Sequence, residues 1–219
     1  MRRFFLFLFL SLLLLAHAPA PKLKLSLPQH LKPLVVLDAG HGGSDDGAKV
    51  NYFMEKRVAL MTTLLVRKRL EELGYRVIMT RSKDVFISLN RRVAIANKTK
   101  AVVFASIHYN SAPSPDVHGI EVFYYGSGKT KRSEQSRKLA SCVLKKIVGE
   151  TRALSRGVKA GNFHVIRETH MPAILVEGGF MTNTIERTQL RDKTYLDKLG
   201  KGIADGIDDY LKKFVLGAN

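Results

Sequence analysis

Segments of buried-strand character alternate with amphipathic segments from about residue 34 to residue 214. Short runs of branched and aromatic apolar residues predict strands at residues 35–37, 75–80, 101–107, 119–125, 163–166 and 173–176. Apolar residues at helical spacing predict helices at residues 55–73, 88–97, 131–148 and 195–214. In the first of these helices we expect one buried face, made of Val58, Met61, Leu64 and Leu65. The alternation indicates one α/β domain with a largely parallel or mixed sheet.

Residues 1–20 have the layout of a secretory signal peptide. Arg2 and Arg3 precede an almost wholly apolar segment at residues 4–15, and small residues suited to cleavage follow it. The apolar segment is short for a membrane span, and an uncleaved anchor is the alternative. Residues 21–33 are rich in Pro and Lys and are interpreted as a linker. We therefore expect a folded domain at residues 34–215 and export to the periplasm or cell envelope.

The chain is strongly basic. Its formal net charge is +17, and loss of Arg2 and Arg3 with the signal peptide leaves +15. Such a charge favours an anionic partner. Because an export signal is present and no nucleic-acid motif is recognisable, we expect an anionic polymer or surface of the envelope, and no nucleic acid. The single Cys142 excludes an internal disulfide and is interpreted as a small core residue.

Three polar residues follow predicted buried strands: His41, in a glycine-rich loop, His108 and Glu177. In an open α/β sheet the carboxyl ends of parallel strands border one crevice, which is the usual site of chemistry. Two imidazoles and one carboxylate form a common zinc-binding set with one open position. We therefore expect His41 and His108 to bind a metal, although a surface histidine in a tight turn is the plain alternative for His41.

The residues themselves leave the third metal ligand open. The candidate carboxylates are Asp38, Asp45, Asp46, Glu55 and Glu177. Asp38 lies at a strand end, where it can instead orient a ligand. Asp45 and Asp46 suit a turn-rich loop, and Glu55 suits the start of a helix without any metal. Glu55 and Glu177 remain the strongest candidates, and neither is favoured over the other.

Several motifs occur in a characteristic order along the chain. They are LDAGHGG at 37–43, EK at 55–56, SIHYN at 106–110 and LVEGGF at 175–180, with shorter pieces at 79–81, 92–97, 156–158 and 171–173. Through these motifs, residues 34–211 or so resemble the zinc-dependent N-acetylmuramoyl-L-alanine amidases of the Amidase_3 family. The resemblance implies one domain with a mixed, mostly parallel six-stranded sheet flanked by helices, and one Zn²⁺ per chain.

The resemblance also separates the two carboxylates. It makes Glu55 the third zinc ligand beside His41 and His108, and Glu177 the catalytic glutamate. With the ligand set complete, Asp38 is expected to orient His41. Asn110 and Arg156 can hold substrate carbonyls or carboxylates. The alternatives are that Asn110 closes a turn and that Arg156 is a solvated charge.

The activity that the resemblance implies is hydrolysis of the amide between N-acetylmuramic acid and L-Ala of the peptidoglycan stem peptide. Zinc would activate the water and polarise the scissile carbonyl, and Glu177 would transfer the proton to the leaving amine. The alternatives are a zinc peptidase or carboxypeptidase acting on the stem peptide, and a non-catalytic cell-wall-binding protein. We expect a monomer, without the inserted inhibitory helix of some relatives. The sequence does not indicate whether an activator protein is needed.

The chain departs from the family pattern at Ala39 and Gly178. Ala39 stands where Pro is usual, and because Ala can adopt the φ of Pro, we expect a slightly looser turn with the chemistry intact. Gly178 stands where Thr is common, so we expect altered contacts beside Glu177.

Overall fold

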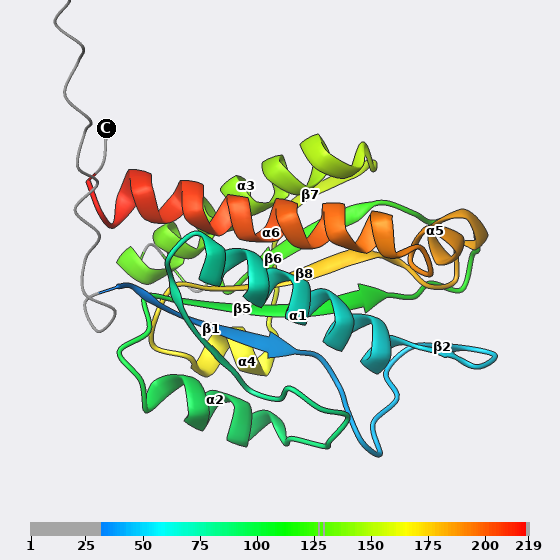
Figure 1. Ribbon diagram of the computed structural model, residues 1–219, viewed down its shortest axis with the longest axis horizontal. Helices are drawn as coiled ribbons and strands as arrows, with labels where there is room; N and C mark the ends of the chain where they lie inside the picture. Colours follow the sequence, from blue (N-terminus) through cyan, green and yellow to red (C-terminus); the bar gives the residue numbers. More distant parts are fainter. Residues whose placement is uncertain (1–31, 127, 129, 218–219) are drawn as a thin grey trace, which may run out of the picture.

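A six-stranded sheet forms the centre of the molecule (Figure 1). The computed structural model describes residues 32–126, 128 and 130–217. The strands are β1 (Leu34–Ala39), β4 (Arg76–Met79), β5 (Val103–Asn110), β6 (Ile120–Tyr124), β7 (Ser155–Ala160) and β8 (Ala173–Phe180). Their order is β4-β1-β5-β8-β6-β7, and every neighbouring pair is parallel except β6 and β8. This confirms the mixed, mostly parallel sheet that the sequence predicted.

Helices cover both faces of the sheet (Figure 1). One face carries α1 (Glu55–Glu72), α3 (Lys131–Thr151) and α6 (Lys193–Phe214), and the other carries α2 (Leu89–Asn97) and α4 (His164–Glu168). Successive side chains of a strand point to opposite faces. Leu37 of β1 therefore packs in the core under α1, α3 and α6, whereas Val36 packs in the smaller core under α2 and α4. The four predicted helices are confirmed to within a few residues at each end.

The buried face of α1 differs from the predicted one. Met61 is 49 % exposed and Leu64 is 39 % exposed. The residues that face the core are mostly small or β-branched, and they include Val58, Ala59, Thr62, Thr63 and Val66. The buried threonines are tolerated because their hydroxyls are bonded, Thr63 Oγ1 donating to the Ala59 carbonyl at 2.6 Å. The prediction was therefore right for Val58 and Leu65, which pack in or against the larger core, and wrong for Met61 and Leu64.

The strand predicted at residues 163–166 is wrong, because this segment begins α4. A short apolar run carries no periodicity that separates a strand from a helix. The missing strand is β7, which lies at the edge of the sheet and whose residues are only partly buried or exposed. The hairpin of β2 (Lys49–Val50) and β3 (Phe53–Met54) and the helix α5 (Thr184–Gln189) were also not predicted, since each is too short to show a period.

The proposed signal peptide at residues 1–20, and residues 21–31 of the linker at 21–33, lie outside the described residues. In the part of the chain that the structure describes, no helix has the length and apolar character needed to cross a membrane. Cys142 is partly buried and packs against the larger core, as expected.

Candidate metal centre

The loop after β1 turns sharply at His41. His41 and Gly42 have φ angles of 57° and 127°, a region that L side chains rarely adopt. A Cβ atom on Gly40 would overlap the ring of His108. Gly40 therefore lets the loop approach His108, and Gly42 permits the positive φ of the turn.

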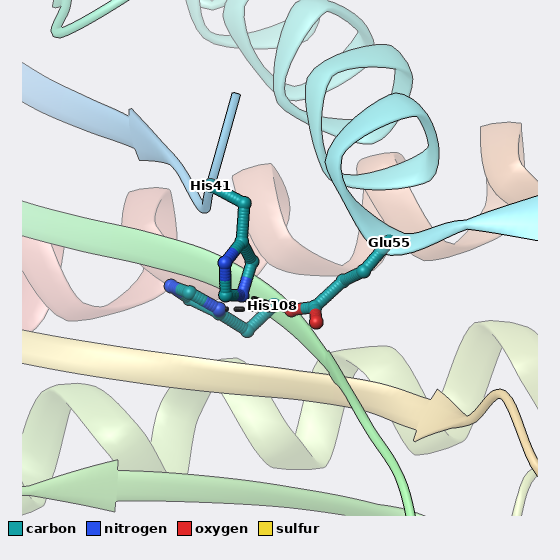
Figure 2. Close-up of side chains that lie close together, drawn as sticks. All are labelled: His41, Glu55 and His108. Carbon is teal, nitrogen blue, oxygen red and sulfur yellow. Dashed lines mark hydrogen bonds and ion pairs between the residues drawn. The ribbon is translucent and has the colours of Figure 1, made fainter. Parts of the chain in front are cut away.

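The side chains of His41, Glu55 and His108 point toward one another from the loop after β1, the start of α1 and β5 (Figure 2). Glu55 Oε1 lies 3.1 Å from His41 Nε2 and 2.9 Å from His108 Nδ1. One ligand atom from each residue lies within 4.8 Å of the other two. The structure thus brings together the three predicted ligands, in the two-imidazole, one-carboxylate composition of catalytic metal sites.

Glu55 is held as a carboxylate. Burial alone would raise its pKa, but hydrogen bonds with His108 and His41 hold that pKa well below its usual range. The backbone N–H groups of Ala48 and Tyr109 also donate to this carboxylate, at 2.8 and 3.0 Å. Burial lowers the pKa of His41, yet the carboxylates of Glu55 and Asp45 raise it overall. Protonation of His41 therefore competes with metal binding, which makes the affinity fall at low pH.

The carboxylate that holds the His41 ring belongs to Asp45. Its Oδ2 lies 2.8 Å from His41 Nδ1. Gly42 and Asp45 exchange two backbone hydrogen bonds, at 2.9 and 3.1 Å, which fold the loop back so that Asp45 reaches the ring. The expectation that Asp38 orients His41 is therefore wrong. The sequence could not reveal this pairing, because it depends on how the loop closes.

Asp45→Ala is expected to weaken metal binding about 10- to 100-fold, because the His41 ring loses the partner that fixes its orientation. Isothermal titration with Zn²⁺ measures this affinity, and Asp116→Ala, an exposed carboxylate in another loop, is the control. Equal Zn²⁺ affinity in the two variants would refute the role of Asp45.

Asp38 instead anchors a buried network behind the loop. Its carboxylate accepts hydrogen bonds from Thr80 Oγ1 at 2.6 Å, Ser106 Oγ at 2.7 Å and Arg92 Nη1 at 2.7 Å. Arg92 also donates to the carbonyls of Ala39 and His41, at 2.6 and 2.7 Å. The buried guanidinium of Arg92 therefore holds the backbone of the loop. The sequence had presented Arg92 only as part of a motif.

A second arginine, Arg81, holds the same loop. It donates to the carbonyls of Ala39 and Gly40, at 2.9 and 2.5 Å, and to the carbonyl of Lys56 at 2.9 Å. Because Lys56 follows Glu55, this side chain ties the loop of His41 to the start of α1. In the sequence, Arg81 was likewise visible only as part of a short motif.

Glu177 lies beside His108 in the sheet. The two residues are paired in register on β8 and β5. Both residues were predicted to lie just past their strand ends. They lie within the strands instead, because β5 continues to Asn110 and β8 to Phe180. Glu177 Oε2 is buried and has no hydrogen-bond partner among the described residues. Burial raises the pKa of Glu177 well above its usual range, and the charges of Glu55 and Glu121 add to this effect.

Asn110 and Arg156 meet on a carboxylate that the sequence reasoning did not select, Glu121. Asn110 Nδ2 donates to Glu121 Oε1 at 2.9 Å, and Arg156 Nε donates to Glu121 Oε2 at 3.0 Å. Glu121 lies on β6, directly opposite Glu177 on β8. The strands β5, β8 and β6 therefore carry His108, Glu177 and Glu121 in one row. In the sequence, Glu121 could have been recognised as a candidate because it is an acidic residue inside an apolar strand.

An apolar pocket of about 180 Å³ adjoins the two histidines. The apolar part of its wall is formed by Phe86, Ile87, Leu89, Phe163, Val165 and Leu175, and its polar lining includes Asp38, Asp45, Arg92 and His164. Small-molecule sites commonly combine such walls with a few polar groups. The candidate metal centre therefore adjoins both an apolar surface and the row that leads to Glu121.

Gly178 leaves room for the ring of Tyr109. A Cβ atom at Gly178 would lie 2.8 Å from Tyr109 Cε1. Tyr109 is 2 % exposed, and its hydroxyl lies 2.5 Å from Thr62 Oγ1, so the ring is fixed. Gly178, at a position where the family commonly has Thr, therefore makes room for the large side chain of Tyr109.

Gly178→Thr is expected to destabilise the protein by about 1–3 kcal/mol, through overpacking against Tyr109. Urea unfolding measures the change. Gly149→Ala is the control, because a Cβ atom at that position of α3 has no neighbour within 4 Å. A Gly178→Thr variant as stable as the control would show that the Tyr109 ring moves freely.

The fold and this site define an α/β protein with a candidate metal centre at the carboxyl ends of parallel strands. The chain belongs to the Amidase_3 family, described as N-acetylmuramoyl-L-alanine amidase, which matches residues 35–209.

Named relatives agree with this assignment. The N-acetylmuramoyl-L-alanine amidase LytC of Bacillus subtilis is 35 % identical over 81 % of this chain and 35 % of its own length. AmiC of Neisseria meningitidis is 33 % identical over 84 % of this chain and 54 % of its own length. The catalytic domain of the amidase CwlV from Bacillus (Paenibacillus) polymyxa has 40 % identity and a TM-score of 0.77, over 82 % of this chain and 98 % of that domain. The chain thus spans only part of LytC and AmiC, and nearly all of the CwlV catalytic domain.

Proposed function

We propose that this protein is a zinc-dependent N-acetylmuramoyl-L-alanine amidase. It would hydrolyse the amide between the lactyl group of N-acetylmuramic acid and L-Ala of the stem peptide in peptidoglycan. The observation that carries the proposal is the convergence of His41, Glu55 and His108 beside Glu177, whose Oε2 is buried without a partner among the described residues. The family match supports this choice of bond.

The donor set fits zinc. Two imidazole nitrogens and one carboxylate oxygen are typical zinc ligands, whereas Mg²⁺ and Ca²⁺ prefer oxygen ligands alone. His41, Glu55 and His108 would hold the ion, and Asp45 would keep the His41 ring in position. When bound, Zn²⁺ supplies an activated water and polarises the scissile carbonyl.

Glu177 would take the proton from the attacking water and return it to the leaving amine. A general base works best when its pKa lies near the operating pH. Burial and the charges of Glu55 and Glu121 raise the pKa of Glu177 from its usual acidic value, which supports this role. No described residue forms a hydrogen bond with its Oε2 that would compete for the proton.

Asn110 and Arg156 would bind the substrate on the side of Glu177 that lies toward β6. Each is fixed by one hydrogen bond to Glu121. Their amide and guanidinium groups are suited to the carbonyl and carboxylate groups of a peptide.

We infer that the catalytic unit, residues 34–215, acts in the cell envelope after export by residues 1–20, with residues 21–33 as a linker. The positive charge of the chain supports retention on an anionic envelope surface. We propose that the protein is a monomer. We also propose that it has no inserted inhibitory helix, since β6 ends at Tyr124 and α3 begins at Lys131, which leaves too few residues between them for such a helix.

The test is digestion of purified peptidoglycan with the zinc-loaded protein, followed by mass analysis of the products. We expect free stem peptides that begin with L-Ala, and no such release in the presence of a chelator. Shortened peptides that remain attached to the sugar would indicate a peptidase instead. Unchanged activity with the chelator would refute the zinc site.

A further inference from the structure

A buried carboxylate on β6 fixes two cations. Glu121 is 5 % exposed, and its Oε2 accepts hydrogen bonds from Arg156 Nε at 3.0 Å and Lys159 Nζ at 2.5 Å. Both cations come from the edge strand β7. One carboxylate facing two cations leaves an excess of one positive charge in this cluster, which we call the β7 cationic pair (Arg156 and Lys159).

The β7 cationic pair is both accessible and held in place. The side chains of Arg156 and Lys159 are 32 % and 41 % exposed, whereas that of Glu121 is 6 % exposed. Arg156 also donates from Nη1 to the carbonyl of His118 at 3.2 Å, and its guanidinium lies 5.0 Å from the centre of the Phe180 ring. A cation that is already fixed loses little conformational freedom when it binds an anion.

The pair lies at a defined place relative to the candidate metal centre. His108, Glu177 and Glu121 are paired in register across three adjacent strands. With strands about 4.8 Å apart, Glu121 lies roughly 10 Å from His108. An extended peptide covers about 3.3–3.6 Å per residue, so roughly three residues span this distance. His108 also borders the apolar pocket that contains Phe86 and Phe163.

We propose that the β7 cationic pair binds a carboxylate within the first three residues of the stem peptide. This contact then sets the direction of the substrate. The peptide, which carries free carboxylates, extends toward β7. The lactyl and acetamido groups on the sugar side carry no charge and take no part in this contact. This inference rests on the proposed amidase function, and it assigns Glu121 the part of a positioning residue that acts through Arg156 and Lys159.

The test compares two muropeptides that differ only in whether the peptide carboxylates are free or amidated. For the wild type we expect kcat/KM to be about tenfold higher with free carboxylates, because charged hydrogen bonds are the stronger ones. Lys159→Gln is expected to reduce this preference to about threefold or less. Lys145→Gln, an exposed cation on α3, should keep the full preference.

Titration calorimetry with the stem peptide alone gives a second readout that needs no catalysis. The free-acid peptide should bind the wild type more tightly than the amidated one, and Lys159→Gln should remove most of this difference. Equal kcat/KM for both muropeptides in the wild type, or an equal loss of both in Lys159→Gln, would overturn the inference while leaving the amidase intact. If the wild type released no peptide from either muropeptide, the proposed function would fail, whatever the calorimetry showed.

Discussion

Glu177→Gln is expected to lower kcat for amide hydrolysis by about 10²- to 10⁴-fold, the contribution typical of a positioned general base. Gln has nearly the same shape but cannot accept the proton of the attacking water. Zn²⁺ affinity should remain close to that of the wild type, because Glu177 is not part of the group formed by His41, Glu55 and His108. Assays on a defined muropeptide and calorimetry with Zn²⁺ measure the two quantities.

The control for this variant is Glu150→Gln, which changes a surface carboxylate of α3 that pairs with Lys201. It should retain full activity. A Glu177→Gln variant with more than about a tenth of wild-type kcat would exclude Glu177 as the general base.

The same variant also has an expected stability effect in the metal-free protein. Because the pKa of Glu177 is higher in the folded state than its usual value, its contribution to stability is present at low pH. That contribution is lost as the pH rises through the folded-state pKa, since a buried charge must then form near Glu55 and Glu121. Gln does not titrate, so metal-free Glu177→Gln should be at least as stable as the wild type at pH 7 in urea unfolding.

Asp38→Ala is expected to destabilise the protein by about 3–5 kcal/mol, because it leaves a buried cation without its partner. Asp38 and Arg92 are 1 % and 3 % exposed. Burial alone would raise the pKa of Asp38, but the Arg92 charge and the hydrogen bonds of Thr80, Arg92 and Ser106 lower it overall. Ala removes the carboxylate that accepts from Thr80, Ser106 and Arg92, and the Arg92 charge keeps only carbonyl acceptors.

Urea unfolding at neutral pH measures the effect of Asp38→Ala, with Asp116→Ala as the surface control. The wild-type contribution of Asp38 is present above the unfolded-state pKa and is lost as the pH falls through the lower folded-state pKa. The difference between Asp38→Ala and the wild type should therefore shrink in acid. A loss below about 1 kcal/mol at neutral pH would show that Arg92 finds another partner.

Local signals were sufficient to predict much of the site. The glycine-rich loop around His41, the start of a helix at Glu55 and the buried strand that carries His108 are each visible in a short stretch of sequence. The separate roles of Glu55 and Glu177 were not, and only the family resemblance assigned them. In the structure, Glu55 Oε1 contacts both imidazoles, whereas Glu177 Oε2 has no partner among the described residues.

Features that depend on loop closure or strand register could not be predicted. Asp45 reaches His41 only because the loop closes between Gly42 and Asp45. Glu121 acquires its neighbours because β6 is antiparallel to β8 and parallel to the edge strand β7. Since β7 is largely polar and partly exposed, its residues show no apolar alternation from which this pairing could have been inferred.

Hydrolysis of a defined muropeptide in H₂¹⁸O tests the central claim most directly. Attack of water on the lactyl carbonyl should place one ¹⁸O in the new carboxylate of the muramic acid and none in the released peptide, which begins with L-Ala. Mass analysis of the two fragments reads both outcomes at once. Incorporation of ¹⁸O into a peptide carboxylate, with the lactyl amide intact, would contradict the amidase assignment.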